Sequence, residues 1–124
     1  MASTTFSGPV TSTNGFVGAI TGIGTATATA GAATLNALHG KVTSESLTTA
    51  QNVNYTLTIT NSRIAAADIV MASVANGTNT QGTPVIVRVT PAAGSVVVIV
   101  RNAHDSAQAF NGTIVVSFTT VKAV

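Results

Sequence analysis

The chain contains no cysteine and very few charged side chains. Asp, Glu, Lys and Arg make up 6% of its 124 residues, against about 25% in an average soluble domain. Without cysteine, the protein has no disulfides, thiolate zinc sites or cysteine nucleophiles. Only four leucines are present, and the other strong helix formers are scarce as well. These shortages argue against a helical bundle, a coiled coil and a charge-rich disordered tail.

The few charges are also scattered along the chain. Five Lys and Arg residues against three Asp and Glu residues give a formal net charge of +2. Nucleic-acid-binding proteins gather basic side chains into a patch that displaces counterions from phosphates. Here the basic residues lie far apart in the sequence, at Lys41, Arg63, Arg88, Arg101 and Lys122. We therefore expect no nucleic-acid partner.

Small and β-branched residues are abundant instead, with 22 Thr, 20 Ala and 17 Val. Thr and Val favour strands because their branched side chains pack well on a pleated surface. The clearest strand spans residues 53–61, where Tyr55, Leu57 and Ile59 alternate with Asn and Thr. Further strands are expected at 68–74, 85–90, 95–102 and 113–121, and the turn at 92–94 pairs two of them in a hairpin.

Short strands separated by turn signals, with no long helical period, predict an all-β fold. We expect an antiparallel β-sandwich or jelly roll over residues 33–124, preceded by an extended Gly/Thr/Ala-rich N-terminal arm over residues 1–32. Residues 96–100 are apolar on both faces of their strand, so this strand is either central in a sheet or covered by another chain. With so few charges to keep copies apart, a homo-oligomer is expected.

The first charged side chain in the sequence is Lys41, so the N-terminal arm contains none. Residues 24–31 alternate as a strand with one face of small side chains. Residues 16–38 are about as long as a membrane span, but threonines and glycines interrupt them, so no membrane segment is expected. The first residues lack the basic and apolar regions of a signal peptide, and we expect synthesis in a cytoplasm.

Few residues in the sequence could carry out catalysis. His104 and Asp105 form the one adjacent histidine–carboxylate pair. A metal site needs three or four ligands, and the other candidates, His39, Glu45 and Asp68, are distant in sequence. The G-x-S-x-G motif of serine hydrolases is absent. We therefore expect no enzymatic activity, no catalytic residue, no metal and no cofactor.

The aromatic residues divide between a core and a contact role. Tyr55 and Phe118 lie on apolar strand faces and are predicted to be core residues. Phe110 lies in a polar loop, which favours a contact anchor on the surface. Large apolar residues also occur singly in the arm. The predicted interface residues are Phe6, Phe16, Val17, Ile20, Ile23 and Phe110.

Several short stretches resemble known structural proteins of viruses. Residues 6–16, with the sequence FSGPVTSTNGF, resemble the N-termini of small structural proteins from the head modules of tailed bacteriophages. The segments at 76–85, 96–102 and 111–114 resemble the same group. The resemblance covers most of the chain and includes no catalytic signature.

The resemblance implies a capsid decoration, or cement, protein. Such a protein is a small β-domain, often trimeric, that binds the phage major capsid protein on the capsid exterior of the virion and stiffens the shell. The family has no fixed binding motif, so the resemblance assigns no residue. Two alternatives stay open: a tail or head-fibre component, and a carbohydrate-binding or adhesin-like module. The second is weakened by the absence of Trp and the presence of a single Tyr, because sugar sites usually stack their ligands on exposed aromatic rings.

Overall fold

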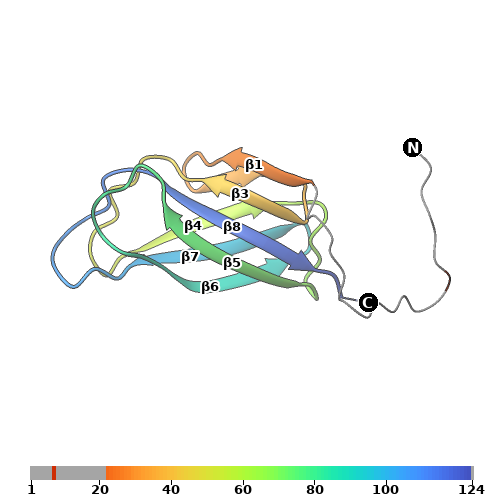
Figure 1. Ribbon diagram of the computed structural model, residues 1–124. Coiled ribbons are helices and arrows are strands. Elements are labelled where there is room, and N and C mark those ends of the chain that lie inside the picture. Colours follow the sequence, from red (N-terminus) through yellow and green to blue (C-terminus); the bar gives the residue numbers. More distant parts are fainter. Residues whose placement is uncertain (1–6, 8–21, 124) are drawn as a thin grey trace, which may run out of the picture.

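The computed structural model describes residue 7 and residues 22–123, and the described part consists of strands, turns and loops. Figure 1 shows eight strands in chain order. They are β1 (Ile23–Thr27), β2 (Ala32–Thr34), β3 (His39–Thr43), β4 (Asn54–Thr60), β5 (Ile69–Asn76), β6 (Pro84–Ala92), β7 (Ser95–Asn102) and β8 (Ile114–Val121).

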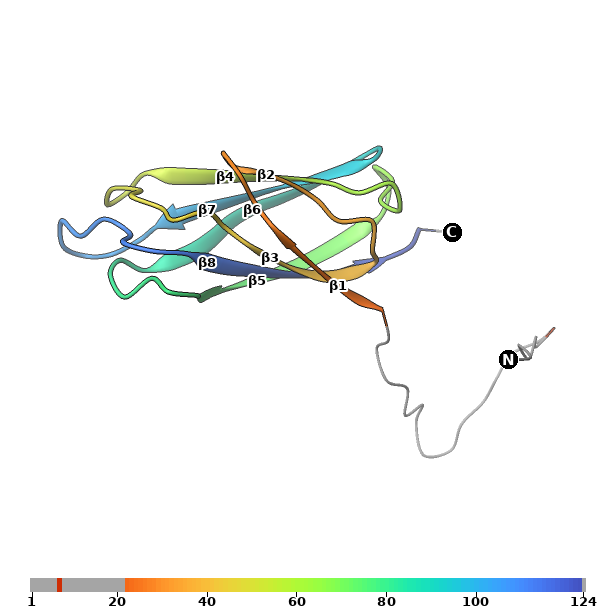
Figure 2. The same cartoon turned by 90° about the horizontal axis from the view of Figure 1, so that it is seen from above.

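The strands form two four-stranded sheets that pack face to face (Figure 2). Sheet A has the order β1-β3-β8-β5, and sheet B has the order β2-β4-β7-β6. The edge strands β5 and β6 lie beside each other and close one side of the sandwich (Figure 1). The predicted β-sandwich is therefore confirmed, whereas nothing in this strand order confirms the jelly-roll alternative.

The prediction that all strands pair antiparallel is wrong for two pairs. Strand β1 runs parallel to β3, and β2 runs parallel to β4. Parallel neighbours need a crossover connection, which is usually a helix. Here a strand of the opposite sheet provides the crossover. In chain order β2 of sheet B lies between β1 and β3, and β3 of sheet A lies between β2 and β4. The N-terminal part of the chain thus alternates between the two sheets.

The core lies between the sheets and is built by strict alternation along the strands. Tyr55, Leu57 and Ile59 of β4 point inward, as do three valines of β7. On β8 the inward apolar residues are Ile114, Val116 and Phe118. Burying one such Val, Ile or Leu side chain stabilises the fold by about 1.5–3 kcal/mol. The prediction is confirmed for Tyr55 and Phe118, which are both buried. Val53 lies outside β4 and is half exposed.

The sandwich begins earlier than residue 33. Strand β1 already pairs with β3 from Ile23 onward, so residues 23–32 are part of the folded domain and not of an extended arm. The alternation at 24–31 signalled this strand, but β1 ends at Thr27 and the chain turns at Ala30 and Gly31. Gly24 and Gly40 face each other across β1 and β3, and a Cβ at either position would lie 2.5 Å from a methyl group of Leu35. The two glycines therefore form a slot that admits this leucine side chain.

A half-buried carboxylate, Glu45, holds the turn between β1 and β2. The chain turns at Ala30 and Gly31, both with positive φ. Glu45 Oε1 accepts a hydrogen bond from the Gly31 amide at 2.9 Å, and its Oε2 accepts one from the Tyr55 hydroxyl at 3.0 Å. Burial, followed by the contact with Glu45, raises the pKa of the Tyr55 hydroxyl far above its ordinary value.

A second carboxylate joins the start of β5 to the end of β8. The Asp68 side chain is almost fully buried and pairs with the Lys122 ammonium group. It also accepts hydrogen bonds from the amides of Ala65, at 2.7 Å, and Ala123, at 3.0 Å. The Lys122 hydrogen bond and these two amides lower the pKa of Asp68 from 3.8 to about 2. This clamp fixes the end of sheet A at which Ile69 pairs with Val121.

Candidate interaction surfaces

The outer face of sheet A carries apolar side chains at one end. Ile69 and Met71 of β5 are 62% and 56% exposed, and Val121 of β8 is 48% exposed. Ile69 pairs with Val121, and Met71 pairs with Thr119. These four residues, Ile69, Met71, Thr119 and Val121, are called the Met71 patch below. Ile23 lies in the same cross-strand row as Met71 and Thr119 and is 53% exposed.

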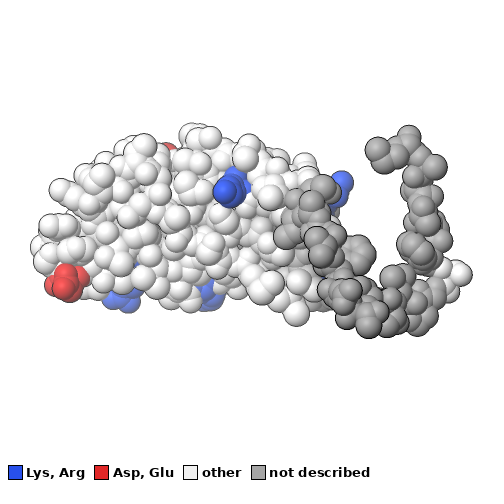
Figure 3. Space-filling model, viewed as in Figure 1, with Lys and Arg blue, Asp and Glu red and all other residues white. Residues whose placement is uncertain are grey.

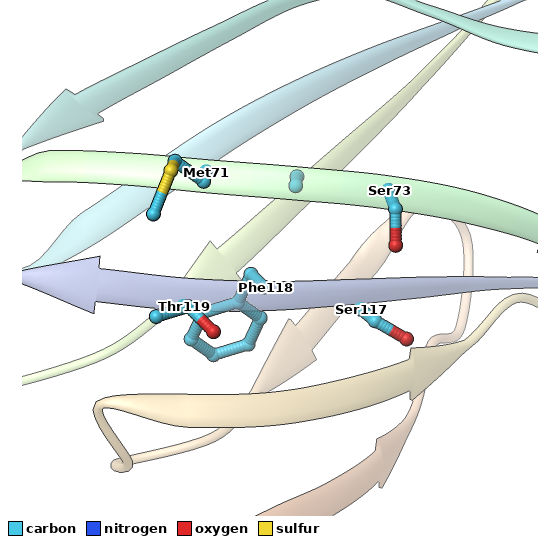
Figure 4. A pocket seen from close by; sticks show the side chains of 6 residues that line it. Met71, Ser73, Ser117, Phe118 and Thr119 are labelled. Carbon is cyan, nitrogen blue, oxygen red and sulfur yellow. The ribbon is translucent and has the colours of Figure 1, made fainter. Parts of the chain in front are cut away.

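A shallow hollow continues from the Met71 patch along the groove between β5 and β8. It has a volume of about 300 Å³ and is lined by Met71, Ala72, Ser73, Ser117, Phe118 and Thr119. Figure 4 shows Met71 and Ser73 on β5 facing Thr119 and Ser117 on β8. The hollow therefore offers an apolar end and a row of hydroxyl groups, which suits an uncharged protein segment.

The face of sheet A is almost free of charge. Lys41 is the only Lys, Arg, Asp or Glu residue in the four strands of this sheet. Figure 3 shows this side of the molecule as a broad white surface with isolated blue and red groups. Antiparallel sheets that face water normally carry charged or polar residues on the outer side. An uncharged outer face of this kind is typical of a contact surface.

The outer face of sheet B has a different pattern. Thr56, Thr58 and Thr60 form a hydroxyl ladder on β4. Next to it, an apolar stripe runs along β6 and β7, with two arginines between its members. We define the sheet B stripe as Val85, Val87, Val97 and Ile99, and the arginines are Arg88 and Arg101. A bulge between Ile86 and Arg88 interrupts β6, and such bulges protect an edge against further strand pairing.

Strand β7 resolves the two alternatives that its sequence left open. Residues 96–100 are apolar on both faces because β7 is a central strand, between β4 and β6. Its inward valines are fully buried, while Val97 and Ile99 on the outer side remain partly exposed. The central position explains the pattern, and the partial exposure leaves the outer residues accessible to another molecule.

The loops at one end of the sandwich are locked by buried asparagines. The Asn102 side chain donates to the carbonyls of Thr49, at 3.0 Å, and Gln108, at 2.7 Å. Its oxygen accepts hydrogen bonds from the amides of Thr83, at 3.0 Å, and His104, at 3.3 Å. With two donors and two acceptor positions all engaged, this amide uses its full hydrogen-bonding capacity. The connection from β5 to β6 is thereby tied to the connection from β7 to β8.

The expectation that Phe110 is an exposed contact anchor is corrected by the structure. Phe110 is 2% exposed and belongs to the core. The loop around it folds inward because its polar groups bind other loops: the Phe110 amide donates to the Thr49 carbonyl at 3.0 Å. Gly82 packs against the ring of Phe110, and a Cβ at residue 82 would lie 2.7 Å from a ring carbon. Polar neighbours in the sequence signalled a loop but not its inward fold.

The other predicted interface residues fall into two groups. Phe6, Phe16, Val17 and Ile20 lie outside the described residues. Ile23 is described and exposed at the start of β1, on the outer face of sheet A. Its role in an interface stays a prediction. Sequence reasoning missed Ile69 and Met71, because apolar residues occupy both faces of β5 and the pattern does not tell which face is outside. It also missed Val121, the last residue of β8.

His104 and Asp105 do not form a proton relay in this structure. The Ser106 hydroxyl lies 3.0 Å and Asp105 Oδ1 lies 3.4 Å from the same nitrogen of His104, Nδ1. A relay of the serine-hydrolase kind needs the hydroxyl and the carboxylate on opposite ring nitrogens. Within residues 22–123 no three His, Cys, Asp or Glu side chains gather as metal ligands would. Nor does this part of the chain include a helix that is long and apolar enough to cross a membrane.

Comparisons with protein-family models, with curated protein sequences and with solved structures give no match for this chain.

Proposed function

We propose that this chain is a non-enzymatic structural protein of a virus particle, a capsid decoration protein bound to the outer surface of a bacteriophage capsid shell. The observation that supports this proposal is the presence of apolar, weakly charged areas on both outer faces of one small sandwich. Monomeric soluble proteins rarely expose contiguous apolar patches unless these bind a partner. A protein that sits in a lattice needs two such surfaces, one for the shell and one for its neighbours.

In this proposal the face of sheet A binds the shell. The Met71 patch supplies the apolar contact and the hydroxyl-lined hollow supplies hydrogen bonds. Lys41 is the one Lys or Arg within the described strands of sheet A, so the shell is expected to present a carboxylate opposite it. Each contact can be weak, because many copies bind a repeated surface.

Copies of the chain associate through the sheet B stripe, as a homo-oligomer in which a trimer is favoured. Val97 and Ile99 supply the centre of this contact, and exposed Val85 and Val87 extend it along β6. Arg88 pairs with Ile99 and Arg101 pairs with Val85, so the two arginines lie among the apolar residues and supply polar contacts within the stripe.

Immunogold electron microscopy of virus particles tests this proposal directly. Antibodies raised against the purified chain are applied to particles produced from the genome that encodes it, with antibodies pre-absorbed on the chain as the control. Gold on the outer surface of the heads is the expected result. Gold confined to tails or fibres would favour the tail alternative, and unlabelled particles would contradict a virion role altogether.

A further inference from the structure

A second hollow lies at the end of the sandwich where β1 and β3 begin and β8 ends (Figure 1). Its volume is about 260 Å³, and it shares no lining residue with the hollow beside Met71. It is formed by the residue before β1, the connection from β2 into β3, and the connection from β4 to β5. The lining residues are Gly22, Asn36, Ala37, Leu38, His39 and Arg63, and we call this site the Arg63 hollow.

A buried asparagine fixes the walls of the Arg63 hollow. Asn61 is fully buried. Its Nδ2 donates to the Ala37 carbonyl at 2.6 Å, and its Oδ1 accepts a hydrogen bond from the Arg63 amide at 3.0 Å. The Lys122 ammonium group donates to the Arg63 carbonyl at 2.8 Å. The backbone of Arg63 is therefore held on both sides, while the residue itself is exposed.

The side chains of the Arg63 hollow offer hydrogen-bond donors. Arg63 is the one charged residue of the lining, and it forms no ion pair with any residue in 22–123. Asn36 Oδ1 already accepts a hydrogen bond from the Ser62 amide at 2.9 Å, so its amide nitrogen is the group left for a ligand. His39 Nδ1 is buried without a hydrogen-bond partner among the described residues, a cost that an acceptor beside the ring would relieve.

This set of donors selects a carboxylate. The planar guanidinium group of arginine binds both oxygens of a carboxylate at once. A phosphate group carries a charge of about −1.5 to −2 at neutral pH, which is more than one guanidinium group balances. Sites for whole small molecules measure about 300–1,000 Å³, so a hollow of about 260 Å³ suits a single acidic side chain.

The acidic side chains of this chain are placed elsewhere. The sequence contains three Asp and Glu residues. Glu45 is bound at the turn between β1 and β2, and Asp68 is buried against Lys122. The Asp105 side chain is 98% exposed, but it lies in the connection from β7 to β8, at the other end of the sandwich (Figure 1). The carboxylate therefore has to come from another molecule.

We propose that the Arg63 hollow binds an acidic side chain of a partner protein. The carboxylate pairs with the Arg63 guanidinium group and accepts a further hydrogen bond from the Asn36 amide nitrogen. Ala37 and Leu38 of the lining pack against the methylene groups of the bound side chain. The site is separate from the Met71 patch, and the proposal does not depend on a place in a virion.

The test uses the full chain, labelled for NMR, and a peptide as the probe. The probe is the acetylated and amidated tripeptide alanine–glutamate–alanine at neutral pH, and the control is the same peptide with glutamine. We expect the backbone amide signals of Ala37, Leu38 and Arg63 to shift saturably with the glutamate peptide, at the millimolar concentrations typical of so small a ligand. Equal shifts with both peptides, or none with either, would overturn the proposal.

Two substitutions at Arg63 test how the carboxylate is held. Arg63→Gln removes the charge, and the affinity for the glutamate peptide should fall about tenfold or more. Arg63→Lys keeps the charge without the planar fork and should give an intermediate affinity. Arg88→Gln, which removes an arginine from β6, is the matched control and should bind as wild type. Unchanged binding by Arg63→Gln would contradict the proposal.

Two further measurements examine other occupants. Inorganic phosphate should bind more weakly than the glutamate peptide, and tighter binding of phosphate would overturn the assignment to an acidic side chain. Asp105→Asn, in the absence of peptide, should leave the Ala37 and Leu38 signals at their wild-type positions. A shift of these signals would show that Asp105 of a second copy fills the hollow, and would contradict a separate partner protein.

Discussion

The two outer faces of the sandwich share a low charge but differ in the arrangement of their apolar residues. On sheet A the apolar side chains gather at one end, beside Gly22 and the Asp68–Lys122 clamp, with one lysine elsewhere on the face. On sheet B they run as a stripe along β6 and β7, between arginines and a threonine ladder. In the function that we propose, the two faces serve two kinds of partner, a foreign protein surface on sheet A and further copies on sheet B.

The largest expected effect separates the inner from the outer face of sheet A. Replacing Phe118 by Ala removes a buried ring and should lower the free energy of unfolding by about 3–5 kcal/mol. Met71 lies on β5, which pairs with the strand of Phe118, but its side chain points outward. Replacing Met71 by Ala should lower the free energy of unfolding by less than about 1 kcal/mol. Urea denaturation measures both variants. Equal losses would mean that the outer apolar residues serve the fold and not contacts.

The next effect distinguishes the two halves of the sheet B face. Val97→Glu places a carboxylate on the sheet B stripe between the cross-strand partners Thr58 and Thr90, where burial without a charged partner is strongly unfavourable. We expect this variant to dissociate the homo-oligomer to the 12.3 kDa chain, as measured by sedimentation velocity. Thr60→Glu on the threonine ladder is the matched control and should keep the wild-type mass. Dissociation by the control alone would place the interface on β4.

Acid should weaken the end of sheet A that carries the Met71 patch. The pKa of Asp68 is about 2 in the folded chain, against an ordinary value of 3.8. A lowered pKa stabilises the fold at pH values above the ordinary value, and this contribution is lost as the pH falls from about 4 toward 2. In Asp68→Asn the free energy of unfolding should depend less on pH over this range, while Asp105→Asn in the exposed loop should behave as wild type. Urea unfolding at pH 5 and pH 2.5 measures how much free energy of unfolding each variant loses on acidification. An equal loss in wild type and Asp68→Asn would rule out the Asp68–Lys122 pair as the source of the acid sensitivity.

The smallest effect concerns the threonine ladder. Thr58→Val keeps the shape and β-branching of the side chain and removes a hydroxyl on the outer face of β4. Its effect on the free energy of unfolding should lie within about 0.5 kcal/mol, and its sedimentation coefficient should match wild type. A marked change in mass would mean that the ladder belongs to the contact surface.

The sequence predicted the strands well because alternation along β4 and β8 reflects a buried and an outer face directly. It could not predict the parallel pairs of β1 with β3 and β2 with β4, since partner choice depends on crossings between sheets and not on local pattern. The boundary at residue 32 was set too late because β1 has small side chains that resemble an arm. Gly24 and Gly40 show why small residues are needed there: they admit Leu35.

The contact surfaces were harder to predict than the fold. Phe110 was placed outside because its neighbours are polar, yet those neighbours satisfy their hydrogen bonds within the loops and draw the ring inward. The Met71 patch was missed because both faces of β5 are apolar, and a pattern without contrast does not say which face meets the core. Phe6, Phe16, Val17 and Ile20 stay predictions, since they lie outside the described residues.

The most direct test of the account is the mass of the full wild-type chain in solution, measured by light scattering over a range of concentrations. Contact between copies through the sheet B stripe predicts a stable mass that is a multiple of 12.3 kDa, with a trimer favoured. A mass of 12.3 kDa at every concentration would contradict association through the sheet B stripe and remove the main support for a lattice role.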